Sequence, residues 1–230
     1  MISINNLEFS YGNKEVLKGV SMRIETGKVY GLLGLNGSGK TTLFNCIYGW
    51  LKLQAGTIVF DGGHPPKKVT AFVESELFFY SHITAREHLS LFNHAKRDID
   101  QLANLLQLPL DNLTEDFSHG MKKKLALLSA FVSGKLFFIL DEPFNGLDLE
   151  SIEVVKQIIA KLNSQGITFI ISSHMIETLI TGCDCICYLN DGRIQESFER
   201  DQFHRVRETI LADIHALTSD KISEAMKPKA

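Results

Sequence analysis

One segment near the N-terminus, VYGLLGLNGSGKTTLFNCIYGW (29–50), constrains the fold more than any other. It begins as a nearly continuous apolar run, which is typical of a strand buried on both faces of a parallel sheet. A glycine-rich stretch follows directly, and a helical apolar pattern then runs from Thr41 to Trp50. The order strand, glycine loop, helix predicts an α/β protein with a mostly parallel sheet.

The flanking segments predict two additions to this core. Isolated apolar residues alternate with polar ones at Ile2 and Ile4 and again from Val20 to Ile24, as in half-buried antiparallel strands. From Thr84 to about Ala130 the periodicity becomes helical, with a capping box formed by Thr84 and Glu87. We therefore expect an N-terminal antiparallel β subdomain and an inserted α-helical lobe at 74–130.

The second half of the chain returns to alternating strands and helices. Two buried strands are predicted within KLFFILDE (135–142) and ITFIIS (167–172), with a helix over 149–165 between them. YLNDGRI (188–194) has the Asp-Gly turn of a β-hairpin. The main domain should therefore occupy residues 1–195, followed by a partly helical tail at 196–230.

Composition narrows the class of protein. The chain has 230 residues and a formal net charge of −3, so nothing in its charge favours nucleic-acid binding. The N-terminus lacks the apolar run of a signal peptide. The most apolar stretch, 125–140, is interrupted by Ser133, Gly134 and Lys135 and is too short to span a membrane. We expect a cytoplasmic protein.

GLNGSGKTT (34–42) fits the phosphate-binding pattern GxxxxGK[ST] in the strand–helix setting that this motif requires. Glycines let successive backbone N–H groups turn inward around the phosphates. The Lys40 ammonium would reach the β- and γ-phosphates, and the Thr41 hydroxyl would bind Mg²⁺. The residues predicted to surround the nucleotide here are Gly34, Asn36, Gly37, Ser38, Gly39, Lys40, Thr41 and Thr42.

Two carboxylates end the second buried strand, LFFILDE. Adjacent carboxylates at the end of an apolar strand repel each other unless a cation lies nearby. Asp141 is the candidate to hold Mg²⁺ through water, and Glu142 is the candidate to orient the water that attacks the γ-phosphate. These positions predict a nucleotide-hydrolysing P-loop NTPase.

Taken together, residues 1–195 resemble the ATP-binding-cassette (ABC) ATPases. FSHGM (117–121) resembles the family's signature sequence, usually LSGGQ. It keeps Ser118 and Gly120 and departs at Phe117, His119 and Met121. In that family the signature of one subunit caps the γ-phosphate held by the other. The resemblance therefore implies two ATP molecules in a head-to-tail dimer, formed with a second copy or with a paralogous ATPase subunit.

Further positions match the family in order. FNGLD (144–148) resembles the D-loop, which implies that Asp148 lies at the dimer interface near the nucleotide. SSH resembles the switch and assigns His174 to the γ-phosphate and the attacking water. Tyr11 resembles the aromatic residue that stacks on adenine. At the Q-loop, Ser75 stands where the family usually has a metal-contacting Gln, flanked by Glu74 and Glu76.

The resemblance implies an ATPase subunit of a membrane transporter, peripheral on the inner face of the cell membrane and driving separate transmembrane permease subunits. Met121 followed by lysines resembles exporter-type subunits. Two alternatives stay open: a soluble ABC ATPase that remodels a macromolecular complex, and a nucleotide-binding regulator with little hydrolysis.

Two clusters have simpler structural explanations. Cys183, Cys185 and Cys187 alternate, which predicts three small buried side chains on one face of a strand, because the CxxC pair of a typical zinc site is absent. For 122–124, three consecutive lysines, a solvated first helical turn is favoured over a phosphate-attracting cluster.

Overall fold

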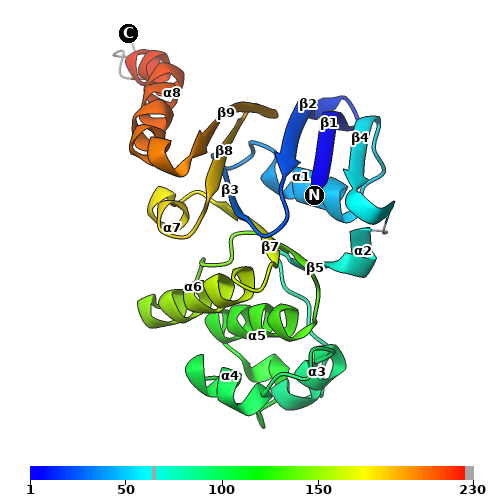
Figure 1. Ribbon diagram of the computed structural model, residues 1–230. Coiled ribbons are helices and arrows are strands. Elements are labelled where there is room, and N and C mark those ends of the chain that lie inside the picture. Colours follow the sequence, from blue (N-terminus) through cyan, green and yellow to red (C-terminus); the bar gives the residue numbers. More distant parts are fainter. Residues whose placement is uncertain (64–65, 226–230) are drawn as a thin grey trace.

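Two β-sheets organise the chain, and a group of helices extends beyond one end of the larger sheet (Figure 1). The computed structural model describes residues 1–63 and 66–225. The strands are β1 (Ile2–Tyr11), β2 (Lys14–Ile24), β3 (Val29–Leu33), β4 (Ala55–Phe60), β5 (Thr70–Val73), β6 (Phe137–Leu140), β7 (Thr168–Ser173), β8 (Cys185–Asn190) and β9 (Arg193–Glu199). The helices are α1 (Lys40–Tyr48), α2 (Pro66–Val69), α3 (Ala85–Phe92), α4 (Ile99–Leu105), α5 (His119–Val132), α6 (Leu149–Asn163), α7 (Ile176–Ile180) and α8 (Phe203–Ala225).

The smaller sheet is the predicted N-terminal antiparallel subdomain. Its strand order is β2-β1-β4, and both pairs are antiparallel. Ile4 lies between Met22 on one side and Ile58 on the other. The sequence pattern predicted the first two strands and missed β4.

The larger sheet has the order β5-β6-β7-β3-β8-β9. Every pair from β5 to β8 is parallel, and only β9 of the described strands in this sheet runs antiparallel to its neighbour. Asp191 and Gly192 join β8 to β9 with positive φ angles of 46° and 71°, as a type I′ turn requires. The mostly parallel α/β sheet and the Asp-Gly hairpin are both confirmed.

Hydrophobic side chains pack on both faces of the larger sheet. Along β6, Phe137 and Ile139 belong to the cluster shared with the smaller sheet and α1. Phe138 and Leu140 belong to the opposite cluster, which includes side chains of α5 and α6. The centre of the sheet is therefore covered on both sides, which explains why its strands β3, β6 and β7 are nearly continuous apolar runs.

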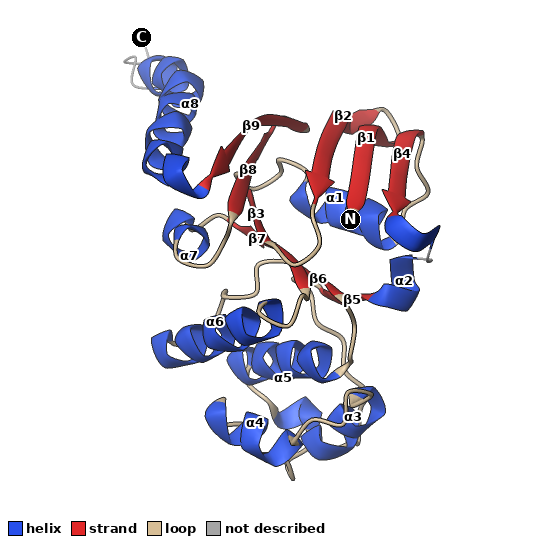
Figure 2. Cartoon of the chain, in the orientation of Figure 1, coloured by secondary structure: helices blue, strands red, loops and turns tan. Residues whose placement is uncertain are grey.

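Helices α3, α4 and α5 form a lobe at the lower end of the molecule, separated from the smaller sheet by the larger one (Figure 2). Thr84 and Glu87 form the predicted capping box at α3. Ser118 caps α5 by accepting a 3.2 Å hydrogen bond from the Met121 amide. The helices of this lobe run from Ala85 to Val132, slightly beyond the predicted end at residue 130.

The C-terminal part differs from the expectation in where the main domain ends. The expected boundary after residue 195 falls inside β9, whose pairing with β8 makes it part of the larger sheet. Most of the expected tail is the helix α8, and its residues 226–230 lie outside the described residues. No helix within the described ranges has the length and apolar character needed to cross a membrane.

The three alternating cysteines do not share one face, which corrects the expectation. Cys185 and Cys187 pack toward the smaller sheet, whereas Cys183 packs in the opposite cluster with Tyr188. The reason is that β8 begins at Cys185, so the two-residue alternation of a strand does not extend back to Cys183. All three thiols are buried and unpaired by disulfides.

Candidate functional site

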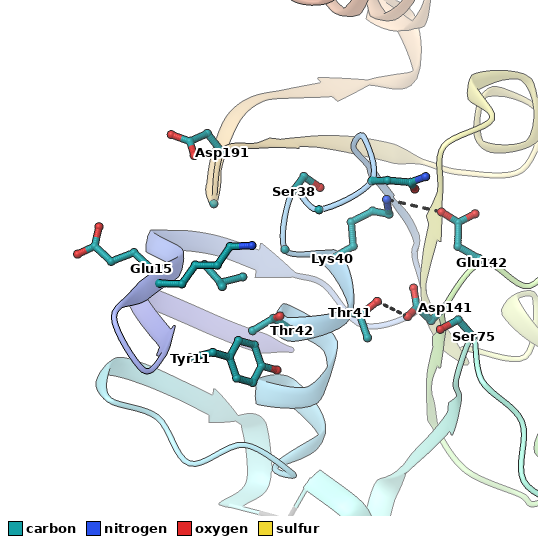
Figure 3. A pocket seen from close by; sticks show the side chains of 16 residues that line it. Tyr11, Glu15, Ser38, Lys40, Thr41, Thr42, Ser75, Asp141, Glu142 and Asp191 are labelled. Carbon is teal, nitrogen blue, oxygen red and sulfur yellow. Dashed lines mark hydrogen bonds and ion pairs between the residues drawn. The ribbon is translucent and has the colours of Figure 1, made fainter.

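A cavity of about 510 Å³ lies where β3 and β6 end, beside the smaller sheet (Figure 3). Segments from distant parts of the chain line it: the end of β1, the start of β2, the glycine loop with the start of α1, the segment after β5, the segment after β6, and the β8–β9 turn. The lining residues predicted from the sequence are Tyr11, Asn36, Gly37, Ser38, Gly39, Lys40, Thr41, Thr42, Ser75, Asp141 and Glu142. We call this space the nucleotide cavity.

The glycine loop leaves room for a ligand. Gly37 has a φ of +82°, and a Cβ placed on it would meet no atom within 4 Å. Gly39 has a φ of +109°, and a Cβ there would lie 3.0 Å from Leu17 Cδ2. The first glycine therefore keeps the cavity wall open, and the second lets the loop pack closely on β2 before α1 begins.

Lys40 and Thr41, the first two residues of α1, face the two carboxylates. Lys40 Nζ donates a 2.7 Å hydrogen bond to the Gly34 carbonyl and lies 3.6 Å from Glu142 Oε1. Thr41 Oγ1 donates a 2.7 Å hydrogen bond to Asp141 Oδ2. The contacts of Lys40 with Glu142 and of Thr41 with Asp141 are drawn as dashed lines in Figure 3.

The two carboxylates are held by neighbouring strands. The Asp141 amide bonds to the Val73 carbonyl at 2.8 Å, and its carboxylate accepts a hydrogen bond from Ser172 Oγ. The Glu142 amide donates to the same Ser172 hydroxyl at 2.8 Å. Glu142 has a φ of 48°, a strained conformation for a residue other than glycine. Such strain persists only where the surroundings enforce it, and it is frequent at active sites.

His174 completes this group. It follows β7 directly, and its Nδ1 lies 3.0 Å from Glu142 Oε2. One oxygen of Glu142 therefore faces the Lys40 ammonium while the other faces the imidazole. A carboxylate oriented in this way beside a phosphate-binding loop is suited to act as a general base toward water.

The oxygen atoms around Thr41 and Asp141 fit a magnesium ion. Mg²⁺ prefers carboxylate and hydroxyl oxygens, and its sites in phosphate-transferring enzymes combine one or two carboxylates with substrate phosphates. Here a hydroxyl and a carboxylate already lie 2.7 Å apart on the cavity wall. Ser75 lies next to Asp141 in Figure 3 and adds a further hydroxyl.

The remaining predicted residues lie outside the cavity wall. Gly34 is behind the loop, where its carbonyl accepts the Lys40 hydrogen bond. His174 reaches the site through Glu142. Ser118, Gly120 and Asp148 belong to the start of α5 and the segment before α6.

Tyr11, by contrast, lines the cavity and is 51% exposed, so its ring is accessible to a ligand.

Sequence reasoning missed one side of the cavity, formed by β2 and the β8–β9 turn. The lining residues missed are Lys14, Glu15, Val16, Asp191 and Gly192. Gly192 donates its amide to the Ser38 carbonyl at 3.2 Å and accepts from the Lys18 amide at 2.8 Å. The Asp-Gly pattern predicted this turn but carried no signal of its place beside the glycine loop.

The start of α5 packs against the segment before α6. A Cβ on Gly120 would lie 2.8 Å from the Gly146 carbonyl oxygen, and a Cβ on Gly146 would lie 3.0 Å from His119 Cδ2. Asp148 caps α6 by accepting from the Ser151 amide at 2.8 Å. These hydrogen bonds and the nearby Lys124 ammonium hold the pKa of Asp148 well below its usual range.

The prediction of a solvated lysine cluster is wrong for two of its three members. Lys123 and Lys124 are both buried. Lys124 Nζ forms a 3.1 Å ion pair with Asp148, and Lys123 Nζ donates a 3.2 Å hydrogen bond to the Glu74 carbonyl. The helix turns these two side chains toward the protein, where the Asp148 carboxylate accepts from one and the Glu74 carbonyl accepts from the other.

Replacing Gly120 with Ala should destabilise the protein by about 1–3 kcal/mol, because the new methyl group would press on the Gly146 backbone. Gly182→Ala is a matched control, since the nearest atom to its added Cβ is the Thr178 oxygen at 3.7 Å. We expect the control to stay within about 0.5 kcal/mol of the native protein. Urea denaturation measures both, and equal stability of the two variants would contradict this packing.

Comparison with known proteins places this chain among relatives of one family. The family model described as "ABC transporter" matches residues 17–145. A lantibiotic transport ATP-binding protein, SrtF of Streptococcus pyogenes, is 31% identical over 90% of this chain and 95% of its own length. The SkfA peptide export ATP-binding protein SkfE of Bacillus subtilis is 28% identical over 90% of this chain and 93% of its own length.

Solved structures give the same result. The ATP-binding subunit of an ABC transporter superposes with a TM-score of 0.81 at 27% identity, covering 89% of this chain and 92% of that one. A dimeric ATP-binding cassette in a post-hydrolysis state, bound to ADP and phosphate, superposes with a TM-score of 0.75. Its identity is 22%, and the match covers 87% of this chain and 99% of that one. The second match establishes the shared fold.

Proposed function

The chain belongs to the ABC transporter family, and we propose that it is the ATP-hydrolysing subunit of an export system. ABC ATPase domains work as dimers with transmembrane subunits. In this proposal two copies, or this chain and a paralogous ATPase subunit, close head-to-tail on ATP at the inner face of the cell membrane. Their closing and reopening drive separate transmembrane permease subunits.

The observation that carries the hydrolytic function is the arrangement of Glu142 between Lys40 and His174. Lys40 binds and orients the terminal phosphates, and Tyr11 offers its exposed ring to the adenine. Glu142 takes a proton from the attacking water, and His174 holds that carboxylate in place. Thr41 and Asp141 would hold Mg²⁺, which would neutralise negative charge on the phosphates.

The head-to-tail dimer is supported by the position of Ser118 and Gly120. Both residues lie outside the wall of the nucleotide cavity of their own chain, at the exposed start of α5. A helix N-terminus with a hydroxyl cap and free N–H groups is suited to bind phosphate. These groups are therefore available to a nucleotide held by another subunit, with Asp148 beside them.

Export is supported by the relatives. One is named for lantibiotic transport and the other for export of the SkfA peptide, and each matches this chain over nearly its whole length. The sequence resemblance at Met121 and the following lysines points the same way. The cargo of such a system would be a peptide or a compound of similar size, contacted by the transmembrane subunits.

A second cavity supplies a docking site for those subunits. This groove, of about 430 Å³, lies between β5 and the helical lobe and is lined by aromatic and aliphatic side chains with a few charged ones. We call it the lobe groove. Ser75 lines the nucleotide cavity, whereas its neighbours Glu74 and Glu76 line the lobe groove. Phe78 also lines it and is 83% exposed. The 74–78 segment thus connects the nucleotide to the surface that would receive a helix of the permease.

Replacing Phe78 with Asp should abolish stimulation of ATP turnover by the membrane partner, because it puts a charge where an apolar helix face would dock. ATP turnover is measured with the permease subunits reconstituted in lipid vesicles. Val59→Asp is the matched control, since Val59 is 54% exposed on β4, outside the lobe groove. The docking site would be refuted by equal stimulation of the Phe78 variant and the native protein.

A further inference from the structure

Lys123 is the most deeply buried cationic side chain near the active site. It lies in the first turns of α5, directly after the signature sequence, and only 1% of its surface is exposed. Burying an ammonium group carries a large desolvation penalty unless acceptors compensate for it. The contacts of the Lys123 ammonium should therefore indicate why this charge is buried.

Its acceptor is the backbone of the 74–78 segment. Lys123 Nζ donates a 3.2 Å hydrogen bond to the Glu74 carbonyl. Among the described residues, 1–63 and 66–225, no other side-chain hydrogen bond joins α5 to Glu74, Ser75 or Glu76. The link connects the helical lobe to the residue immediately before Ser75, on the wall of the nucleotide cavity.

Neighbouring carboxylates offset part of the cost of burying this ammonium. Burial lowers the pKa of Lys123, and the opposing charges of Asp141 and Glu142 offset only part of that shift. Burial and the nearby charges of Asp141 and Glu76 raise the pKa of Glu74. The contact that places the Lys123 ammonium is thus its hydrogen bond to the Glu74 carbonyl.

We propose that Lys123 is a positioning residue that anchors the 74–78 segment to α5, so that movement of the helical lobe shifts Ser75 within the nucleotide cavity. The anchor is made to the backbone, so it works with Ser at position 75 as well as with any other side chain. In this chain Lys123 thus supplies a connection between lobe and nucleotide that does not depend on a glutamine at the Q-loop. The inference rests on the proposed ATPase function.

The test compares steady-state ATP turnover in three variants. Lys123→Met removes the ammonium but keeps a long unbranched side chain, Lys123→Arg restores a cationic donor, and Lys122→Met is the control on the same helical turn. We expect Lys123→Met to lower kcat about tenfold with KM for ATP changed less than about twofold, since misplaced groups affect turnover more than binding. Lys123→Arg should recover most of the loss, and Lys122→Met should resemble the native protein.

Hydrogen exchange of the amides at 74–80, with and without ATP, provides a second readout that a purely structural role would not change. ATP should slow this exchange in the native protein and in Lys122→Met, and it should have no such effect in Lys123→Met. Native kcat in folded Lys123→Met, or ATP-dependent exchange that survives in it, would overturn the proposal. Absence of turnover in the native protein would instead refute the proposed ATPase function.

Discussion

Replacing Glu142 with Gln should abolish ATP hydrolysis while ATP binding is kept. Glu142 is the carboxylate placed between the Lys40 ammonium at 3.6 Å and His174 Nδ1 at 3.0 Å. An amide of the same shape preserves packing, but it cannot accept a proton from water. General-base catalysis typically contributes 10²- to 10⁴-fold, so we expect kcat to fall by at least about 100-fold.

The Glu142→Gln substitution should also change the oligomeric state of the protein in the presence of ATP. Because hydrolysis reopens the proposed dimer, a variant that binds ATP without hydrolysing it should accumulate as the closed dimer. Size-exclusion chromatography with ATP and Mg²⁺ measures this, and phosphate release measures turnover. Glu150→Gln is a suitable control, since Glu150 is exposed in the first turn of α6. Turnover of Glu142→Gln within about threefold of the native rate would exclude Glu142 as the general base.

Replacing Lys40 with Met should abolish high-affinity ATP binding. The Lys40 side chain is only 7% exposed, and its ammonium is held at the loop by the Gly34 carbonyl. It is therefore already oriented for phosphate before ATP arrives, and its charge-assisted hydrogen bonds would be lost entirely. We expect the Kd for ATP to rise about 100-fold, which corresponds to roughly 2.7 kcal/mol.

Isothermal titration calorimetry with ATP measures this change in Kd. The matched control is Lys161→Met, which removes the same charge from the exposed last turn of α6. Native Kd is expected for that control. An unchanged Kd in Lys40→Met would mean that the glycine loop binds ATP without its lysine, contrary to the account given above.

Features encoded in short contiguous segments were predictable from the sequence. The glycine loop, the strand that ends in Asp141 and Glu142, and the Asp-Gly turn each depend on neighbouring residues, and each has the predicted local structure. Local capping was equally accessible, because Thr84 and Ser118 act on amides three residues away.

Strands with weak patterns were not predictable. β4 has one buried residue, Phe60, so its apolar residues do not alternate clearly with polar ones. β5 has four residues, too few to distinguish a buried strand from a helical turn. Both strands are defined by pairing with distant partners, β1 and β6, rather than by their own residues.

Contacts between distant segments were also missed. The lysines after the signature suggested a solvated turn, yet Lys124 pairs with Asp148 and Lys123 reaches Glu74. Asp191 and Gly192 line the nucleotide cavity only because the β8–β9 turn packs beside the glycine loop. Such placements follow from the sheet order, which the spacing of residues along the chain does not specify.

The central claim is tested most directly by identifying what binds the protein when it is held in its ATP-bound state. Glu142→Gln is tagged in its native host, membranes are solubilised gently with ATP and Mg²⁺, and the proteins that co-purify are identified and quantified. We predict a polytopic membrane protein at comparable stoichiometry, lost when Phe78→Asp is added and kept when Val59→Asp is added. Recovery of soluble partners alone, with no membrane protein, would contradict the proposed transporter function.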